Sequence, residues 1–445
     1  MSISWLLQEM EAHSVKDALI LDDQSITYKT LLDHFRQWVA ILKDIEIQPG
    51  EIVALQGDYS PLVCAAILAL IANGNITVPL SSMVDSDIPK LLDIAEVQVS
   101  FTCDGDRYHV QRHAREVSHP ILVDLSNRQE PGLVLFSSGS TGFPKGIVHN
   151  FNKLLEKYKK KRNTLRTLAF LLFDHIGGIN TLFHTLANGG TVICPRGRTV
   201  HDIVSAIEKH RVELIPTTPS FLNLLLLQDA GLNGDLSSLK VITYGTEMMH
   251  EKTLIHLCQK LPEVQFKQTY GLSELGIMSS KSQASDSLWL KIGGEGIETK
   301  IENNILFIRS QTAMKGYLNA PSPFDDEGWF NTQDQVMTDG EYIRFLGRKS
   351  EMINVGGQKV YPAEVENLLL QMPEIEDVLV KGMPNALLGS VVSAVVNTSQ
   401  SMSESEIKKR ITEFCKGKIE RFKIPVYVII QDNELHSKRF KKIRK

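Results

Sequence analysis

Short apolar runs alternate with segments of helical periodicity between Tyr28 and about Lys267. The runs are rich in β-branched residues and lie between turn residues, which is typical of buried strands. We expect strands at residues 52–55, 76–80, 97–102, 133–136, 168–173, 191–194, 213–216 and 240–244. Helices are expected between them, among others at residues 31–42, 61–72, 200–210 and 220–227. This alternation predicts an α/β fold whose sheets are mainly parallel and flanked by helices.

The pattern becomes strand-rich near Gly294 and stays so to residue 348. Turn signals such as Asp339-Gly340 punctuate this stretch. It predicts a small β-barrel-like unit at 294–348, which closes a large N-terminal domain of residues 1–348.

A second alternation of strands and helices follows Gly347. Ser403 is expected to cap its last helix, with Glu406 closing a capping box. The expected strands are 352–355, 358–360, 378–381, 391–397 and 426–430, and the expected helices are 363–370 and 403–417. About a hundred residues suffice for a separate domain. Residues 349–445 are therefore predicted to form a small α+β C-terminal domain.

The composition is that of an ordinary globular chain, and it excludes several classes of protein. A net charge of −4 gives no global electrostatic reason to expect a nucleic-acid partner. The five cysteines are scattered without metal-ligand spacing, so neither a disulfide framework nor a zinc site is expected. The N-terminus lacks the order of a signal peptide, and the most apolar run, 62–72, is shorter than the ~20 residues of a membrane helix. We expect a cytoplasmic protein without a membrane span; its oligomeric state does not follow from the sequence.

Two clusters of basic residues stand out, at 157–162 and 438–445. The first lies late in a predicted amphipathic helix that Asn150 caps. Because apolar residues recur at 151, 154, 155 and 158, the lysines of this cluster are predicted to form a solvated helix face.

The strongest local motif follows the expected strand at 133–136 and ends in Phe143-Pro144-Lys145-Gly146. Its small hydroxyl and glycine residues let backbone N–H groups approach an oxyanion closely, and Lys145 adds a positive charge suited to pyrophosphate. The spacing is not that of a Walker loop. The motif predicts a phosphate-binding loop, formed by Ser137, Ser138, Gly139, Ser140, Thr141, Gly142 and Lys145.

At these residues the chain resembles the superfamily of acyl-CoA synthetases, nonribosomal-peptide adenylation domains and firefly-type luciferases. Further motifs of that superfamily recur in the same order over nearly the whole chain. In Gln268-Thr-Tyr-Gly-Leu-Ser-Glu274, the resemblance implies that Tyr270 stacks on adenine and that Glu274, with Thr141, holds Mg²⁺. The other residues that it implies for ATP or AMP binding in this region are Gly245, Thr246, Glu247, Thr269, Gly271 and Ser273.

The motif Gly328-Trp-Phe-Asn-Thr-Gln-Asp334 resembles the superfamily stretch whose aspartate grips the ribose diol. The residue before that aspartate is usually glycine and is Gln333 here. In the long match 347–366, Arg348 would contact ribose or phosphate, and Gly356 and Gly357 would line a thiol tunnel. The hinge position, usually Asp or Lys, is Ser350, which can also absorb a large backbone change, so the small domain is expected to be mobile.

The C-terminal Phe440-Lys-Lys-Ile-Arg-Lys445 aligns with the superfamily's catalytic-lysine ending. Lys442 takes the place of that lysine and Lys441 remains its competitor. In Phe173-Asp174-His175-Ile-Gly-Gly178, His175 matches the position beside the substrate carboxylate, and Asp174 is interpreted as displaced from the slot that binds an amino group. The acyl pocket is predicted from Ile179, Leu182, Thr246, Gly276, Ile277 and Met278.

Together these features predict an acid–thiol ligase that activates a carboxylic acid with Mg·ATP as acyl-AMP and passes the acyl group to CoA. A fatty or aryl acid fits His175-Ile-Gly-Gly best. Two alternatives stay open: loading of an acyl or amino acid onto carrier-protein phosphopantetheine, and a non-catalytic nucleotide-binding relative. The catalytic residues are then Lys442, Glu274 and His175.

Overall fold

Two seven-stranded sheets form the frame of the large domain in the computed structural model, which describes residues 3–81, 88–138, 143–228, 234–399 and 402–431. In the first, every pairing is parallel except that of β1 with β2. Its strand order is β13 (Gln265–Gln268), β12 (Val241–Tyr244), β11 (Leu214–Thr217), β9 (Arg166–Leu168), β10 (Thr191–Cys194), β1 (Asp17–Leu21), β2 (Gln24–Thr27). The expected α/β fold with mainly parallel pairing is confirmed.

The second sheet has a parallel centre and antiparallel edges. Its strand order is β20 (Gly316–Tyr317), β8 (Pro144–Asn150), β7 (Gly132–Ser138), β4 (Ile76–Leu80), β3 (Ile52–Gln56), β5 (Val99–Asp104), β6 (Arg107–Arg112). Two described parts of the predicted phosphate loop, 137–138 and 144–145, lie at the end of β7 and the start of β8, where the pairing of the sheet changes from parallel to antiparallel.

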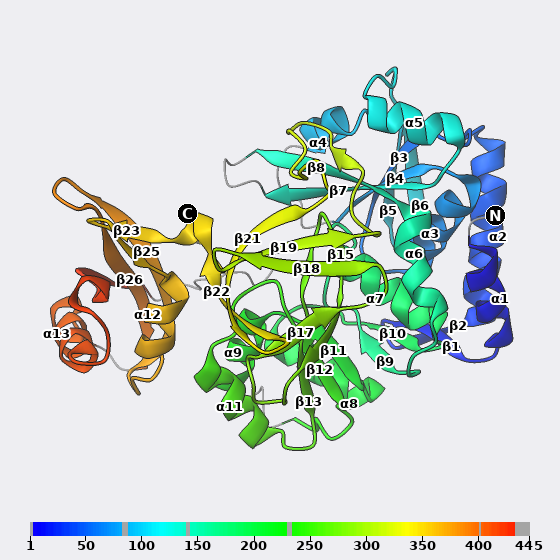
Figure 1. The fold of residues 1–445 in the computed structure, drawn as a ribbon. Coiled ribbons are helices and arrows are strands. Elements are labelled where there is room, and N and C mark those ends of the chain that lie inside the picture. The colour runs from blue at the N-terminus through cyan, green and yellow to red at the C-terminus, as the bar shows by residue number, and fades with distance from the viewer. Residues whose placement is uncertain (1–2, 82–87, 139–142, 229–233, 400–401, 432–445) are drawn as a thin grey trace.

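Helices pack between and outside the two sheets (Figure 1). They are α1 (Ser4–Ala12), α2 (Tyr28–Asp44), α3 (Pro61–Asn73), α4 (Ile88–Ile94), α5 (Pro120–Arg128), α6 (Phe151–Glu156), α7 (Ile176–Ala187), α8 (Val200–His210), α9 (Pro219–Leu227) and α11 (Glu251–Lys260). The main core joins α2, α3 and α7 to one face of each sheet. Helix α3 is apolar on all sides because it is buried there, and Ser60 caps its start while Gly74 ends it in the left-handed conformation.

No helix in the described ranges is both long enough and apolar enough to cross a lipid bilayer.

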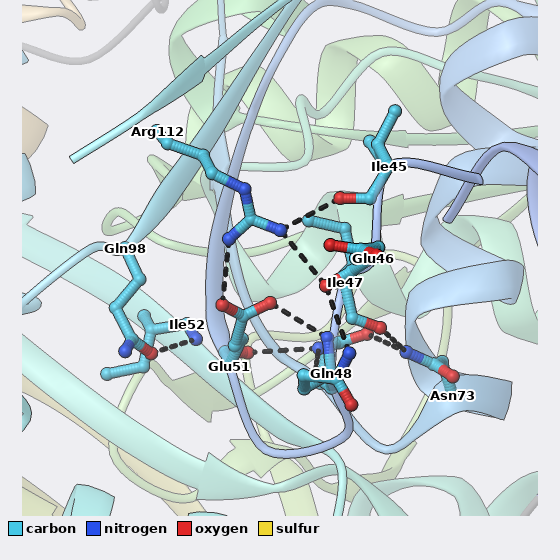
Figure 2. A network of polar contacts seen from close by, with 10 residues as sticks. Ile45, Glu46, Ile47, Gln48, Glu51, Ile52, Asn73, Gln98 and Arg112 are labelled. Atoms are coloured by element: carbon cyan, nitrogen blue, oxygen red, sulfur yellow. Dashed lines mark hydrogen bonds and ion pairs between the residues drawn. The ribbon is translucent and has the colours of Figure 1, made fainter. Parts of the chain in front are cut away.

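A polar network fixes the α2–β3 connection to the edge strand β6 (Figure 2). Arg112 donates to Glu51 Oε1 (3.1 Å) and to the carbonyls of Ile45 and Glu46 (2.8 and 3.0 Å). Glu51 Oε2 also accepts from the Gln48 N–H at 2.8 Å. This network lies at the start of β3, so it stabilises the edge of the sheet at which the parallel strands begin. The opposite edge, at which these strands end, stays available for ligands.

The barrel-like unit is a six-stranded antiparallel sheet that begins earlier than predicted, at Ser279 instead of near Gly294. The polar, serine-rich stretch 279–287 gives no alternating pattern, so its first strand could not be seen in the sequence. The strand order is β16 (Ser279–Ser282), β17 (Leu290–Gly293), β22 (Tyr342–Arg348), β21 (Phe330–Asp339), β19 (Ile305–Ser310), β18 (Ile297–Glu302). A short hairpin of β14 (Gly271–Leu272) and β15 (Gly276–Ile277) precedes it.

The small domain has its own sheet and its own core. Its strands are β24 (Gln358–Val360), β23 (Ile353–Val355), β26 (Gly389–Thr398), β25 (Ile375–Asn385) and β27 (Tyr427–Ile430), with helices α12 (Pro362–Leu369) and α13 (Glu404–Cys415). Ser403 Oγ accepts from the Glu406 N–H at 3.2 Å, as expected of the cap, but the Glu406 carboxylate pairs with Arg410 at 3.2 Å instead of closing a capping box.

Polar contacts join the small domain to the large one. Asn367 Oδ1 accepts from His250 Nδ1 (3.1 Å) and from the Glu251 N–H (3.2 Å), so α12 lies against α11. Lys252 Nζ donates to the Leu370 carbonyl at 2.7 Å. A polar contact of this kind is typical of domains that move relative to one another.

Two other expectations need correction. The strand predicted at 168–173 ends at Leu168, because Phe170 and Phe173 enter two different cores and the chain must turn to bury both. The helix that Asn150 caps ends at Glu156. The chain continues as the 3₁₀ turn η1 (Lys157–Lys159), so Lys157 does not lie on the helix face that the periodicity predicts.

Candidate active site

A cavity of about 30 Å³ lies where β11, β12 and β13 end. The pairings Thr217–Tyr244 and Tyr244–Gln268 bring these three strand ends to one edge. The carboxyl edge of a parallel sheet is where ligands bind in α/β folds. The cavity is lined by Leu171, His175, Gly177, Pro216, Thr217, Thr243, Gly245, Thr246, Thr269, Gly271 and Ile277.

Gly245 and Thr246 form a strained turn in this lining. A Cβ on Gly245 would lie 2.7 Å from the Thr269 carbonyl oxygen, so only glycine fits between the two loops. Thr246 has φ = 71°, which is rare for a β-branched residue. Strain of this kind is found at ligand sites, where the surrounding structure holds it. Glu247, which was expected to join this group, accepts from Ser220 Oγ at 2.5 Å on α9 instead.

Lys145, on the β7–β8 hairpin (the phosphate hairpin), and Glu274 both contact Tyr317. The sequence motifs did not predict a role for Tyr317. Lys145 pairs with Ser137 across β7 and β8, and its Nζ lies 5.1 Å from the centre of the Tyr317 ring. The Tyr317 hydroxyl donates to Glu274 Oε1 at 2.7 Å. Ser138 ends β7. Gly139, Ser140, Thr141 and Gly142 lie outside the described residues.

His149 and Asn319 support this hairpin and were also missed. His149 Nε2 donates to the Ser273 carbonyl at 2.6 Å, and burial lowers the pKa of His149 to about 4, so the ring is neutral. Asn319 Oδ1 accepts from the Gly146 N–H at 3.0 Å. Each contact joins segments far apart in sequence, and neither follows a recognisable spacing.

The described residues contain no group of three His, Cys, Asp or Glu side chains placed to hold a metal ion. Mg²⁺ is commonly held by one or two carboxylates together with water and substrate phosphates. The half-buried Glu274, beside the phosphate hairpin, fits that role. Thr141, the other residue expected at the metal, lies outside the described residues.

Asp334 is buried and engaged at both oxygens. Oδ2 accepts from the Tyr270 hydroxyl at 2.6 Å and Oδ1 from Arg348 Nε at 3.0 Å. Burial and the Asp334 carboxylate raise the pKa of Tyr270, which keeps the phenol as a donor. The Tyr270 ring stacks on Phe345 at 4.8 Å, so only its other face could meet adenine. Gln333 has φ = 59°, which explains why glycine is usual at its position.

His175 is the N-cap of α7 and lines the cavity. Its Nδ1 accepts from the Gly177 N–H at 3.0 Å, which caps the helix. A Cβ on Gly178 would lie 2.0 Å from the Leu172 carbonyl oxygen, so the second glycine permits this close turn. Asp174 is buried, accepts from Ser81 Oγ at 2.8 Å and is absent from the cavity lining.

The predicted acyl-pocket residues divide into two groups. Ile277 and Thr246 line the cavity. Ile179 and Leu182 are buried in the main core and Met278 in the barrel core, so these three do not line it. Gly276 turns the β14–β15 hairpin with φ = 80° and is also outside the lining.

The structure corrects the prediction that all lysines at 157–162 are solvated. Lys159 and Lys160 are exposed, but Lys157 is half-buried and its Nζ donates to Asn180 Oδ1 (2.7 Å) and to the Ile277 carbonyl (3.0 Å). The 3₁₀ turn at η1 points this side chain toward α7.

A larger hollow of about 440 Å³ lies elsewhere, over β3, β5 and β6 beside α4. Its lining includes Gln56, Ser100 and His113 but none of the residues predicted for the active site. Volume alone therefore does not identify the site.

The small-domain residues lie apart from the cavity. Ser350 is exposed in the turn η2 (Lys349–Glu351) directly after β22. Gly356 and Gly357 turn β23 into β24, and the Gly356 N–H donates to the Leu388 carbonyl at 2.8 Å beside the β25–β26 hairpin. Figure 1 shows that hairpin at the outer end of the small domain. Lys441 and Lys442 lie outside the described residues.

The chain is similar to known proteins over nearly its whole length. Residues 7–318 match the family model described as AMP-binding enzyme, and residues 364–442 match that of the AMP-binding enzyme C-terminal domain. An indoleacetate–CoA ligase of Aromatoleum aromaticum is 26% identical, over 99% of this chain and 96% of its own. A 2-succinylbenzoate–CoA ligase of Bacillus subtilis is 24% identical, over 96% of this chain and 94% of its own.

Solved structures share the fold. An anthranilate CoA ligase in complex with anthranoyl-AMP has a TM-score of 0.82 at 20% identity, and the match covers 98% of this chain and 95% of that one. The o-succinylbenzoate coenzyme A synthetase of Bacillus subtilis, in complex with ATP and a magnesium ion, has a TM-score of 0.76 at 22% identity, with 99% and 98% covered.

Proposed function

The chain belongs to the AMP-binding enzyme family, and from that premise we propose that it is an AMP-forming acid–CoA ligase. The observation that carries the proposal is the approach of Lys145 and Glu274 to one ring, that of Tyr317. A cation for phosphate and a carboxylate for Mg²⁺ thereby lie beside one ring, and Glu274 is in the turn of the β14–β15 hairpin, whose Ile277 lines the cavity.

In the first half-reaction, a carboxylate oxygen of the acid attacks the α-phosphorus of ATP. The bond from that phosphorus to the bridging oxygen breaks, pyrophosphate leaves, and acyl-AMP remains. Lys145 and the phosphate loop hold the leaving group, and Lys442 stabilises the charge between the carboxylate and the α-phosphate. When bound at Glu274, Mg²⁺ neutralises phosphate charge.

The nucleoside is held at the barrel. Asp334 accepts from the ribose hydroxyls, Arg348 keeps that carboxylate oriented, and the face of Tyr270 away from Phe345 meets adenine. His175 faces the carboxyl group of the acid, since it is the titratable side chain in the cavity lining.

In the second half-reaction, the sulfur of CoA attacks the acyl carbonyl. The bond to the AMP oxygen breaks, AMP leaves, and the thiol proton is lost. Because Gly356 and Gly357 turn beside the β25–β26 hairpin and do not line the cavity, this step requires the domain to turn about Ser350. The polar contacts at Asn367 are suited to such a change.

The relatives named for indoleacetate and 2-succinylbenzoate support an aryl acid as substrate and CoA as acceptor. Asp174 accepts from Ser81, which disfavours a role in binding an α-amino group. Pyrophosphate release across aryl, fatty and amino acids, with CoA and with a phosphopantetheine carrier protein, tests the proposal. Formation of thioester with the carrier protein and not with CoA would redirect the proposal to the other acceptor, and absence of pyrophosphate release with every acid would contradict it.

A further inference from the structure

Three polar side chains meet behind the cavity wall and a fourth lies one helical turn away, and the proposed chemistry does not use them. Lys157 Nζ donates to Asn180 Oδ1 at 2.7 Å, and the Tyr158 hydroxyl donates to the same oxygen at 3.0 Å. His184 lies one turn beyond Asn180 on α7. We call Lys157, Tyr158, Asn180 and His184 the distal cluster.

The distal cluster adjoins the acyl cavity. Lys157 Nζ donates to the backbone carbonyl of Ile277 at 3.0 Å, and the Ile277 residue lines the cavity. Gly177, which also lines it, shares a face of α7 with Asn180 and His184 at i, i+3 and i+7. With a rise of about 1.5 Å per residue, Asn180 lies roughly 5 Å and His184 roughly 10 Å along α7 from Gly177.

The cluster has one ammonium group, that of Lys157, and lacks an acidic partner among the described residues. The nearby carboxylates pair elsewhere: Glu156 with Lys159 at 2.6 Å, and Glu9 with Lys161 and His13. Lys157 has no ion pair in the described chain, and its two hydrogen bonds go to neutral oxygens. Burial lowers the pKa of Lys157 to about 7, and burial with the charges of Lys157 and Arg162 lowers the pKa of His184 to about 4.

A buried ammonium without a counter-ion is costly, whereas one that meets a carboxylate is stabilised. Asn180 Oδ1 already accepts twice, which orients its Nδ2 as a further donor, and no hydrogen bond from that nitrogen is present in the described chain. The cluster thus offers two donors and a positive charge at the far side of the wall that the acyl chain contacts.

We propose that Lys157 and Asn180 bind a second carboxylate at the far end of the substrate, so that the enzyme activates one end of a dicarboxylic acid. The inference rests on the proposed function, which supplies the first carboxylate at His175. Lys157 is a specificity residue in this scheme: it recognises the acid and takes no part in the bond changes at the phosphate.

The scheme predicts selection by charge. A half-amide of the same diacid has the same shape but leaves the ammonium without its counter-ion, and a site built for a polar group rejects a partner that cannot satisfy it. Wild-type enzyme should prefer the diacid to its half-amide by at least ~10-fold in kcat/KM.

The test measures pyrophosphate release with matched aryl and alkyl diacids and their half-amides. Lys157→Met should lower kcat/KM for the diacid at least ~10-fold more than for the half-amide. Lys157→Arg, which keeps the charge, should retain part of the preference. Lys160→Met removes an exposed lysine three residues away and should leave the ratio as in wild type. The wild-type comparison of the two acids needs no variant to fold.

Equal use of diacid and half-amide by the wild type would overturn the proposal, as would an equal loss for both acids in Lys157→Met. Calorimetric titration with the diacids separates this failure from failure of the proposed function. A protein that releases no pyrophosphate with any acid, yet binds a diacid in a way that Lys157→Met abolishes, contradicts the ligase and supports the carboxylate site. Pyrophosphate release with monoacids and not with diacids supports the ligase and contradicts the carboxylate site.

Discussion

The Tyr317 hydroxyl donates a hydrogen bond to Glu274 Oε1 over 2.7 Å. The two residues come from strand β20 and from the turn between β14 and β15, which are 43 positions apart. The contact orients the carboxylate that we assign to Mg²⁺, and the same ring lies beneath Lys145. Tyr317 is therefore a positioning residue for both charges.

Removing that hydroxyl should weaken the use of Mg·ATP without unfolding the protein. Tyr317→Phe keeps the ring beside Lys145 but deprives Glu274 of its donor, at a cost of about 1–2 kcal/mol, or roughly 5- to 30-fold in kcat/KM for Mg·ATP. The measurement is ATP–pyrophosphate exchange at varied Mg²⁺, with Tyr342→Phe on β22 as the control. If both variants match the wild type, Tyr317 does not position Glu274.

The backbone at Gln333 offers a test of stability. Its φ of 59° places a non-glycine residue in the left-handed region directly before Asp334. Gln333→Gly should raise the free energy of unfolding by about 0.5 kcal/mol, and Gln333→Val should lower it by about 1–2 kcal/mol, because a β-branched side chain clashes there. Urea denaturation of the two variants measures the difference. A glycine variant less stable than the valine variant would contradict the assigned strain.

Asn367 should influence the balance between the two half-reactions. Its side chain accepts from His250 and from the Glu251 backbone, and both contacts belong to an arrangement in which Gly356 and Gly357 lie beside the β25–β26 hairpin and outside the cavity lining. Asn367→Ala should lower acyl-AMP formation about 2- to 10-fold while conversion of supplied acyl-AMP to thioester is kept or increased. Stopped-flow assays of each half-reaction measure this, with Gln371→Ala one turn further as the control. A larger loss in thioester formation than in acyl-AMP formation would show that these contacts belong to the domain arrangement that forms the thioester.

The pKa of Lys157 gives the diacid preference a defined pH dependence. Burial lowers this pKa to about 7, so the ammonium that binds the second carboxylate is charged below pH 7 and is lost as the pH rises through 7. The groups around it are His184, already neutral at this pH, Arg162, Tyr158 and Asn180. Since kcat/KM reports the free enzyme, the ratio for diacid over half-amide should fall above pH 7. A ratio that is flat from pH 6 to 9, or that rises, would contradict the assignment.

Much of the scaffold could be predicted from periodicity. The strands at 76–80 and 191–194 and the helix at 200–210 have the bounds expected, and Asn150 and Ser403 cap the helices assigned to them. These features depend on residues close in sequence, which is why a local pattern reveals them. The strand at 279–282 is polar and was missed for the same reason.

The site was predictable only where a motif carries it. His175, Thr246, Thr269 and Ile277 all belong to motifs and all line one cavity, and their roles in binding stay predictions. Tyr317, Asn319 and His149 were missed because each acts through a contact with a distant segment. Lys157 looked solvated because helical spacing cannot show that the helix ends at Glu156 and that the next residue turns toward α7.

Acid-dependent exchange of pyrophosphate into ATP tests the central claim most directly. The measurement incubates the protein with Mg·ATP, labelled pyrophosphate and an aryl acid or diacid in the absence of CoA. The account predicts exchange that requires the acid, is reduced ~10²-fold or more in Lys145→Ala, and gives way to AMP and acyl-CoA when CoA is added. Absence of exchange with every acid, or release of ADP and phosphate in place of AMP and pyrophosphate, would contradict it.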